Sequence, residues 1–458
     1  MVTGPRALIK EMKTTIVWLS RDLRVADNPA LRDAAAAGAV VPAFIWSPEE
    51  EGRWAPGGAS RWWLERSLTS LDASLRERGS RLFVRRGPVV KALKTLAKEC
   101  GASAVAWNRR YEPAQTSLEW EASLALAEAG VSPEPKPGNV LFEPDAVRTL
   151  SGGPYRVFTP YWARCGTLDG PRPPAGDPGA LRRPAKAPAA PAVGSLGLSK
   201  EAPWQRGLAA AFEPGEAAAA RELAAFLDGP ARDYERTRNL PASDGNSRLS
   251  PRLHFGELSV SRVWREALGS DPSLKGGFLG ELGWRDFGRH ALFHNPSTPD
   301  TPLDARFARF AWRKDKAGFD AWKRGETGYP LVDAGMRELR ATGFMHNRVR
   351  MVVASFLTKD LLIDWREGAA WFWDNLVDAD LASNTLNWQW AAGCGVDAAP
   401  FFRVFNPMEQ ARRFDPDGEY VRRWVPEAGT RDYPPPILDH KEARLRALDA
   451  FGAAGARR

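Results

Sequence analysis

Short apolar runs alternate with amphipathic segments through the first 140 residues. The runs "TTIVWL", "AVVPAFIW", "RLFVRR" and "AVAWN" have the length and the β-branched and aromatic content of buried strands, and the segments between them carry apolar residues at helical spacing. Gly38, Gly79 and Gly101 each follow a helical segment, where glycine commonly ends a helix. This order predicts an α/β domain with a parallel, Rossmann-like sheet over residues 1–140. Because no G-x-G-x-x-G or Walker lysine loop is present, an ordinary dinucleotide or ATP site is not expected there.

The chain changes character after this α/β pattern. Residues 166–203 hold seven prolines between 171 and 191 and predict an extended, poorly packed connector. From about residue 211 the periodicity is helical, as in "GEAAAARELAAFLDG", "PLVDAGMRELRATG" and "NRVRMVVASFLTKDLLIDW". We therefore expect an interdomain linker over 141–210 and an all-α domain over 211–458.

Length, charge and cysteine content narrow the class of protein. The 458 residues exceed the roughly 250 to 300 at which a single core stops growing. A net charge of +8 favours a polyanionic partner, nucleic acid before an anionic membrane surface. Cys100, Cys165 and Cys394 are too few for a disulfide framework or a four-thiolate cluster, so a reducing, cytoplasmic setting is expected. No apolar run reaches about 18 residues and the N-terminus lacks the apolar core of a signal peptide, so neither membrane spanning nor export is predicted.

Tryptophan is unusually frequent, with 19 residues against 7 tyrosines. The segment "DADLASNTLNWQWAAGCGVDAAPFFRVFNP" (378–407) places two tryptophans beside acids and amides. The segment "FLGELGWRDFGRH" (278–290) puts Glu281 and Trp284 at i, i+3 on one helical face, which suits a flat ligand with hydrogen-bonding edges. An amphipathic core helix with a snorkelling acid explains the same spacing.

Two further segments offer polar groups at helical spacing. "GNSRLSP", which begins at Gly245, combines an amide, two hydroxyls and an arginine before a helical segment and favours anion binding, although an ordinary helix cap explains it as well. "FMHNRVRM" (344–351) offers Asn347, Arg348 and Met351, which are polar and soft apolar contacts of the kind that a base pocket requires.

Several long stretches together resemble the photolyase and cryptochrome family. They run over nearly the whole chain: "VWLSRDLRVADNPAL" (17–31), "NSRLSPRLHFGELS", "ETGYPLVDAGMRELRATGFMHNRVRM", "LTKDLLIDWREG" and "DPDGEYVRRWVPE" (415–427). "GGASRWWLERSL" (57–68) is most similar to plant cryptochromes and to the bacterial photolyase class nearest to them. The resemblance implies an α/β antenna domain, a linker and an all-α domain that binds FAD, which is active as FADH⁻.

The resemblance also assigns residues, position by position. Family contacts to the flavin match Tyr234, Asn246, Ser247, Arg248, Leu249, Ser250, Arg350, Asp378, Asp380 and Asn384. Family contacts to the lesion match Glu281, Trp284, Asn347, Arg348, Met351 and Trp390. The electron-transferring tryptophans of the family match Trp388, Trp365 and Trp312. Catalytic roles are therefore expected for Glu281, Asn384 and these three tryptophans, and no metal site is implied.

A few positions distinguish members of the family. Asn384 matches the residue facing flavin N5, where plant cryptochromes resemble one another in having Asp, and an amide cannot act as an acid near neutral pH. Enzymes of the (6-4) class resemble each other in a histidine pair, of which only His346 is present, because Met351 fills the second position. Trp390 matches a residue that single-strand-preferring relatives usually lack. These positions favour repair of cyclobutane pyrimidine dimers in duplex DNA.

We therefore expect light-driven dimer repair by electron transfer from photoexcited reduced FAD, with the dimer flipped out of the duplex. The alternative is a cryptochrome-type blue-light receptor that signals through a partner. The antenna chromophore implied by the resemblance is methenyltetrahydrofolate, with a deazaflavin as the alternative. We expect a monomer with no membrane partner, in the cytoplasm and associated with the nucleoid if the source is bacterial.

Overall fold

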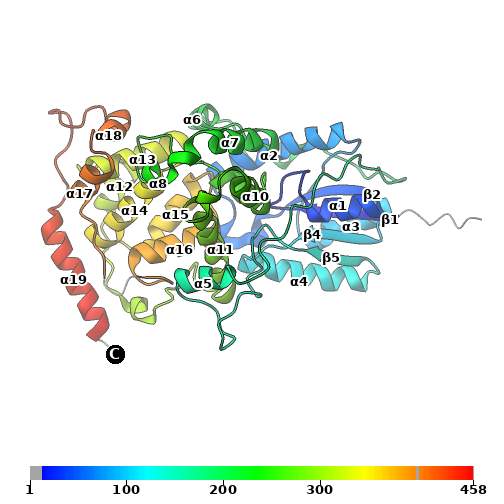
Figure 1. Ribbon diagram of the computed structural model, residues 1–458, viewed down its shortest axis with the longest axis horizontal. Helices are drawn as coiled ribbons and strands as arrows, with labels where there is room; N and C mark the ends of the chain where they lie inside the picture. Colours follow the sequence, from blue (N-terminus) through cyan, green and yellow to red (C-terminus); the bar gives the residue numbers. More distant parts are fainter. Residues whose placement is uncertain (1–12, 399–401, 457–458) are drawn as a thin grey trace, which may run out of the picture.

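The computed structural model describes residues 13–398 and 402–456. Its α/β part and its helical part lie side by side, with the strands at one end of the molecule and the C-terminal helix α19 (His440–Ala456) at the other (Figure 1). The predicted order, an α/β domain followed by helices, is confirmed.

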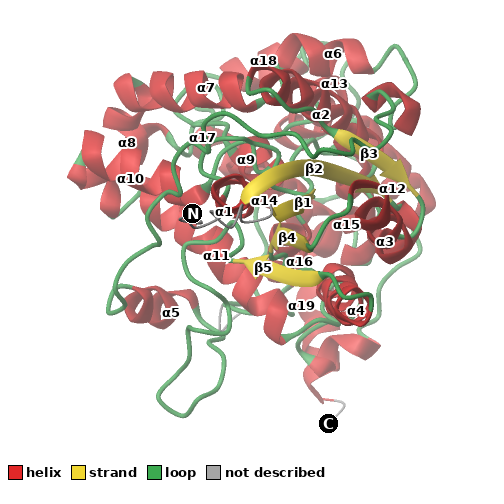
Figure 2. Ribbon diagram, turned by 90° about the vertical axis from the view of Figure 1, so that its right-hand side faces the viewer, coloured by secondary structure: helices red, strands yellow, loops and turns green. Residues whose placement is uncertain are grey.

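The α/β part contains one sheet of five parallel strands in the order β3-β2-β1-β4-β5 (Figure 2). Its strands are β1 (Lys13–Leu19), β2 (Gly38–Trp46), β3 (Phe83–Arg86), β4 (Ala104–Asn108) and β5 (Ser132–Lys136). The four apolar runs of the sequence form the first four strands. The fifth strand, "SPEPK", was not predicted, because its prolines and charges give no strand pattern and are tolerated only at the edge that it occupies.

Four long helices cover the two faces of the sheet. They are α1 (Pro29–Ala37), α2 (Gly58–Glu77), α3 (Val89–Cys100) and α4 (Pro113–Glu128). One apolar cluster joins the sheet to α1 and α2, and a second joins it to α3 and α4. Gly101 ends α3 with φ 64°, a left-handed conformation that favours glycine, as its position in the sequence indicated.

The proline-rich segment is better packed than predicted. It lies between α5 (Phe158–Cys165) and α6 (Gln205–Ala211). Leu181, Leu196 and Leu198 within it are at most 4% exposed and join the apolar cluster of α1 and α2. Scattered leucines therefore anchor the segment to the α/β part, while its prolines prevent regular structure and most of its residues are exposed.

Helices make up the remainder of the chain. Their bounds are α7 (Glu216–Asp228), α8 (Tyr234–Thr237), α9 (Ser250–Phe255), α10 (Val260–Ser270), α11 (Phe278–His294), α12 (Lys316–Arg324), α13 (Pro330–Thr342), α14 (Asn347–Ser355), α15 (Trp365–Asn375), α16 (Leu381–Ala392), α17 (Pro407–Phe414) and α18 (Glu419–Trp424). In the ranges that the structure describes, no helix is long and apolar enough to cross a membrane.

Helix α2 connects the two parts of the molecule. Trp63 on α2 is fully buried and stacks on Phe255 of α9, with 5.9 Å between ring centroids. Its indole nitrogen donates to the carboxylate of Glu257 at 2.9 Å, and Arg252 donates to the same carboxylate at 2.8 Å. This buried interface packs α2 of the α/β part against α9 of the helical part.

Candidate active site

The largest group of predicted site residues lines a cavity between α14, α15 and α16. The cavity has a volume of about 610 Å³ including its open mouth. Eight of the residues assigned from the sequence line it: Asn347, Arg350, Met351, Asp378, Asp380, Asn384, Trp388 and Trp390. The structure therefore brings predicted flavin contacts and predicted lesion contacts to a single site.

Asp378 lines the cavity and contacts Ser250, the first residue of α9. One carboxylate oxygen accepts hydrogen bonds from the hydroxyl of Ser250 at 2.6 Å and from the guanidinium of Arg350 at 2.8 Å. The other oxygen, Oδ1, is buried and has no hydrogen-bond partner among the residues that the structure describes. Because a buried carboxylate oxygen without a partner is costly, Oδ1 is suited to accept a hydrogen bond from a ligand in the cavity.

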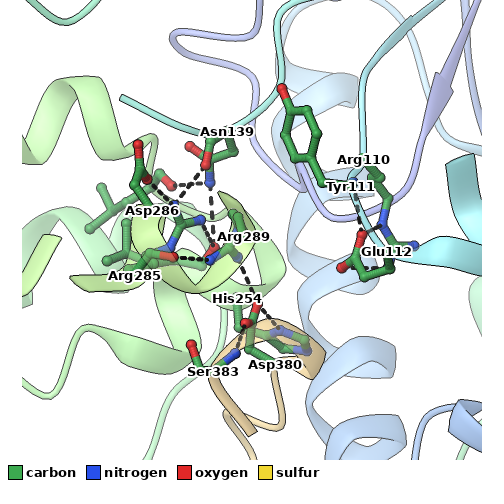
Figure 3. Close-up of polar contacts among 12 residues, drawn as sticks. Arg110, Tyr111, Glu112, Asn139, His254, Arg285, Asp286, Arg289, Asp380 and Ser383 are labelled. Atoms are coloured by element: carbon green, nitrogen blue, oxygen red, sulfur yellow. Dashed lines mark hydrogen bonds and ion pairs between the residues drawn. The ribbon is translucent and has the colours of Figure 1, made fainter. Parts of the chain in front are cut away.

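Asp380 begins α16 and is held by several donors (Figure 3). It accepts from the backbone N–H of Ser383 at 2.9 Å and from the guanidinium of Arg289 at 2.6 Å, while His254 lies 3.6 Å away. Burial opposes the ionisation of Asp380, but Arg289, His254 and Arg285 outweigh it and hold its pKa well below the usual value. Burial also lowers the pKa of His254 to about 4, so the carboxylate is charged and the imidazole neutral at neutral pH.

Asn384 lies one helical turn beyond Asp380, on the same cavity wall. Its side-chain nitrogen donates to the backbone carbonyl of Ala369 on α15 at 3.2 Å. This bond fixes the amide between α15 and α16. The cavity therefore presents an oriented amide at this position and no acid.

The predicted phosphate-binding segment lies at the start of α9. Arg248 adopts φ 52°, which is uncommon for a residue other than glycine, and its exposed side chain lies over the rings of Phe212 and Phe344 at 4.7 and 5.2 Å. Asn246 lies 2.7 Å from His346, and the hydroxyl of Ser247 accepts the backbone N–H of Leu249 at 3.4 Å. These bonds shape the segment.

Two predicted flavin contacts are largely buried in the protein. Leu249 is 2% exposed, and Tyr234 is 7% exposed and packs edge-on against Phe278 at 5.5 Å. Burial raises the pKa of the Tyr234 hydroxyl above its usual value. Both side chains therefore contribute to the packing of the helical part.

The predicted lesion contacts on α11 lie outside the lining of the cavity. Glu281 forms an ion pair with Arg238, whose guanidinium also lies 5.4 Å from the ring of Tyr234. Trp284 stacks on Phe158 of α5, with 3.9 Å between ring centroids and 13° between the planes. Both side chains are partly exposed, so they remain accessible to a large ligand that extends beyond the cavity.

The side chain of Arg348 makes its contacts outside the lining of the cavity. Its guanidinium donates to the side-chain oxygen of Asn239 at 2.7 Å and lies 4.4 Å from the ring of Phe414. Arg348 does not line the cavity, unlike its neighbours Asn347 and Arg350. The structure therefore places Arg348 at the rim.

The three predicted electron-transfer tryptophans differ in their surroundings. Trp388 and Trp365 are 2% and 1% exposed, and Trp312 is partly buried against Phe310 at 4.4 Å. Trp388 packs on α15 at Gly368, where an added Cβ would lie 2.1 Å from the indole. Gly368 lies one turn from Trp365 on α15. Trp388 therefore packs on the face of α15 from which Trp365 projects.

Trp388 also touches an indole that was not predicted. Its ring contacts within the described residues are Phe372 at 5.0 Å and Trp322 at 6.3 Å, both edge-on. Trp322 is fully buried and donates its N–H to the backbone carbonyl of Val353 at 3.0 Å. Sequence analysis did not single out Trp322, because nothing in its local sequence indicates a neighbour 66 positions away.

His346 has a structural role. Its Nδ1 accepts the backbone N–H of Arg348 at 3.1 Å and caps α14, and its Nε2 lies against Asn246. Burial lowers its pKa to about 4. A neutral imidazole with both nitrogens engaged is poorly suited to donate a proton to a substrate.

Comparisons with known proteins identify the family. Residues 15–178 match the family model described as DNA photolyase, and residues 278–430 match the FAD binding domain of DNA photolyase. The deoxyribodipyrimidine photo-lyase of Agrobacterium fabrum is 43% identical over 469 aligned residues, covering 96% of this chain and 97% of that one. Cryptochrome-1 of Arabidopsis thaliana is 40% identical over 90% of this chain and 63% of its own length.

The fold of this chain matches a solved structure over the full length of that structure. The crystal structure of a bacterial class III photolyase from Agrobacterium tumefaciens superposes with a TM-score of 0.93 and 42% identity, covering 98% of this chain and 100% of that one. This chain belongs to the photolyase and cryptochrome family. The resemblance inferred from the sequence motifs is confirmed, and so is the presence of an FAD-binding domain.

The cavity suits the flavin of this family. Asp378 offers a buried carboxylate oxygen without a partner in the described part of the chain, Asn384 offers an oriented amide, and Phe372 and Trp388 supply flat apolar walls. An isoalloxazine ring has N–H and C=O groups on its edge and apolar faces, so this set of groups fits it. We therefore place the photolyase flavin in this cavity in the proposals below.

Sequence analysis missed two arginines of the photolyase site. Arg238 pairs with Glu281, and Arg289 holds Asp380. Both arginines lie far in the sequence from the acids that they pair with. The side of α11 on which Arg289 lies is also set by how this helix packs. The only signal in the sequence was the position of Arg289 on the same helical segment as Glu281 and Trp284.

Proposed function

We propose that this protein repairs cyclobutane pyrimidine dimers in duplex DNA, using light absorbed by bound FAD. The observation that carries the proposal is the single cavity that joins Asn347, Met351 and Trp390 to Asp378 and Asn384. When bound in its reduced form, FADH⁻, the cofactor supplies an excited-state electron to the dimer and receives it back after the ring opens. Loss of the dimer from a defined duplex in light, with a dark control, tests this function.

The residues of the cavity bind and orient the two reactants. Asp378, held by Ser250 and Arg350, accepts a hydrogen bond from the edge of the flavin. Met351 and Trp390 form the apolar wall against which the flipped dimer packs. Met351 lies on α14 and Trp390 on α16, and these helices pack together, so the dimer would dock in the same cavity whose residues would hold the flavin.

The cyclobutane dimer is the better substrate than the (6-4) product. Opening a cyclobutane ring needs no proton donor. His346 is neutral, caps α14 and contacts Asn246, and the thioether of Met351 cannot donate a proton. The site therefore lacks the proton donor that the (6-4) reaction would require.

The runner-up is a cryptochrome-type blue-light receptor. It would use the same cavity and the same buried indoles to signal through a partner. The fixed amide of Asn384, which anchors to Ala369, offers the flavin no acid and favours repair. Repair activity in light distinguishes the two functions.

We further propose methenyltetrahydrofolate as the antenna, with a deazaflavin as the alternative. A second cavity, of about 430 Å³, lies at the carboxyl ends of β1 and β2 and is lined by Trp18, Phe44, Trp46, Arg21 and Arg110. Aromatic walls and two guanidiniums suit a flat ring that carries anionic groups, at a position where open α/β sheets commonly bind ligands. The fluorescence of the extracted chromophore distinguishes the two candidates.

We propose that the protein acts as a monomer in the cytoplasm, where it is associated with the nucleoid if the source is bacterial. The net charge of +8 supports an encounter with the DNA backbone. Size-exclusion chromatography with light scattering, in the presence and absence of damaged duplex, tests the oligomeric state.

Replacement of Glu281 by alanine is expected to reduce lesion affinity and repair while FAD content stays unchanged. The variant removes an acceptor for the pyrimidine edge and leaves Arg238 without its carboxylate, at a cost of about 1–3 kcal/mol. Glu281→Gln should recover part of the loss, and Glu121→Ala, at an exposed acid on α4, serves as the control. Unchanged repair per absorbed photon at saturating DNA would show that Glu281 does not contact the lesion.

A further inference from the structure

A buried lysine follows α14, the helix that carries the predicted lesion contacts Asn347, Arg348 and Met351. Helix α14 continues into a π-helical turn, η6 (Phe356–Asp360), and Lys359 in this turn is 2% exposed. Turns of the π type are rare and occur frequently at functional sites. The proposed repair reaction assigns no role to Lys359.

The amine of Lys359 contacts a segment that follows α16. It donates to the backbone carbonyl of Arg403 at 3.0 Å and lies 3.7 Å from the centroid of the Phe402 ring. Across the described residues, no carboxylate lies within 4.0 Å of this amine, and the adjacent Asp360 pairs instead with His440. Because a buried ammonium without a carboxylate is costly, the carbonyl and the ring face are its main compensation.

A second anchor holds the same segment one turn away. The hydroxyl of Ser355 accepts the backbone N–H of Phe405 at 3.3 Å. Ser355 and Lys359 are four residues apart, so they lie on one face of the helical turn. Together they fix both ends of the segment 402–405.

This segment packs behind a wall of the lesion site. The ring of Phe405 lies 6.3 Å from the ring of Trp390, with 52° between the planes. Trp390 is only partly buried, and it lines the cavity that joins flavin and lesion contacts. The orientation of Trp390 therefore depends on where the segment 402–405 is held.

We propose that Lys359 is a positioning residue for lesion binding, which fixes the segment 402–405 so that Phe405 supports Trp390 against the dimer. The inference rests on the proposed function, in which Trp390 contacts the dimer. Lys359 itself touches neither the dimer nor the flavin.

The charge of Lys359 should make this support depend on pH. Burial lowers its pKa to about 7. The titratable groups that act on it are Asp360 on the same turn and Cys394 after α16. Asp360 contacts His440 and Arg446 of α19, and burial raises the pKa of Cys394 to about 12, so that the thiol stays neutral. As pH rises through about 7, Lys359 loses its proton and the ring of Phe402 loses a cation, so lesion affinity should fall.

The test compares DNA binding by the FAD-loaded wild type and a Lys359→Met variant, which keeps the chain length and removes the amine. We expect affinity for dimer-containing duplex to fall about tenfold, while affinity for undamaged duplex, FAD content and photoreduction rate stay unchanged. The fall in affinity between pH 6 and pH 8 should disappear in the variant. Lys441→Met, which removes an exposed charge from α19, serves as the control and should change nothing.

A second variant keeps the inference testable if Lys359→Met folds poorly. Phe402→Leu removes the ring face, and it should weaken lesion binding without adding to the effect of Lys359→Met in the double variant. Lesion affinity equal to that of wild type, or parallel losses of FAD and of undamaged-duplex affinity, would overturn the inference. A wild type that does not prefer damaged duplex would overturn the proposed function instead, and the inference with it.

Discussion

Replacement of Trp388 by phenylalanine is expected to nearly abolish photoreduction of oxidised FAD and to leave dimer repair by pre-reduced enzyme almost intact. Trp388 lines the cavity proposed for the flavin, and in the proposed route its indole is the last donor to the flavin for electrons that enter through Trp365 and Trp312 or through Trp322. A benzene ring is much harder to oxidise than indole, and a barrier raised by about 3 kcal/mol slows a step by about 100-fold. Repair returns its own electron in each cycle and needs no supply.

Two assays on one preparation decide this prediction. The photoreduction rate and the repair yield after dithionite reduction are measured together with FAD content. Trp371→Phe, at a partly buried tryptophan of α15 outside the proposed route, is the matched control and should behave as wild type. If repair, photoreduction and FAD content all fall together in Trp388→Phe, Trp388 is a packing residue; if photoreduction persists, electrons reach the flavin by another route.

Replacement of Asp378 by asparagine is expected to remove most of the bound FAD. The variant keeps the volume of the side chain, but it leaves the guanidinium of Arg350 beside the cavity without its carboxylate. Removing one partner of a buried ion pair costs about 3 kcal/mol, a value at the low end of the range because Arg350 is partly exposed. The loss of a strong acceptor at Oδ1 adds to this cost in the loaded protein.

FAD retention after gel filtration, read with the thermal stability of the apoprotein, measures the effect. Ser250→Ala removes only one hydrogen bond to Asp378 and should cost about 1 kcal/mol, so its loss of FAD should be smaller. Asp417→Asn, at an exposed acid, is the control. Full FAD occupancy in Asp378→Asn would contradict the placement of the flavin beside this carboxylate.

The strands and most helices of the α/β part could be predicted because their periodicity is local. β2 and β4 are buried along their length and β1 over its last five residues, as the strands of parallel sheets are. β5 could not be predicted, because an edge strand of prolines and charges takes its conformation from its neighbour β4. The packing of Leu181 and Leu198 also depends on α2, which lies far away in the sequence.

The members of the candidate site could be named from family motifs, but their partners could not. The ion pair of Glu281 with Arg238 joins α11 to the loop after α8, and Arg289 reaches Asp380 across 91 positions. The packing of the helices determines which residues form such pairs. The local sequence around either residue does not predict that packing. The same holds for Lys359, whose sequence motif gives no sign that its amine lies against Phe402.

The central claim is tested most directly by measuring repair of two lesions by one pre-reduced sample. Duplexes that carry either a cyclobutane thymine dimer or a (6-4) photoproduct are incubated with the protein, and the restored bases are quantified after blue or near-UV illumination and after equal time in the dark. The account predicts that only the cyclobutane dimer is restored, and only in light. Restoration of neither lesion in light, with FAD fully bound and reduced, would contradict it, as would equal restoration of both.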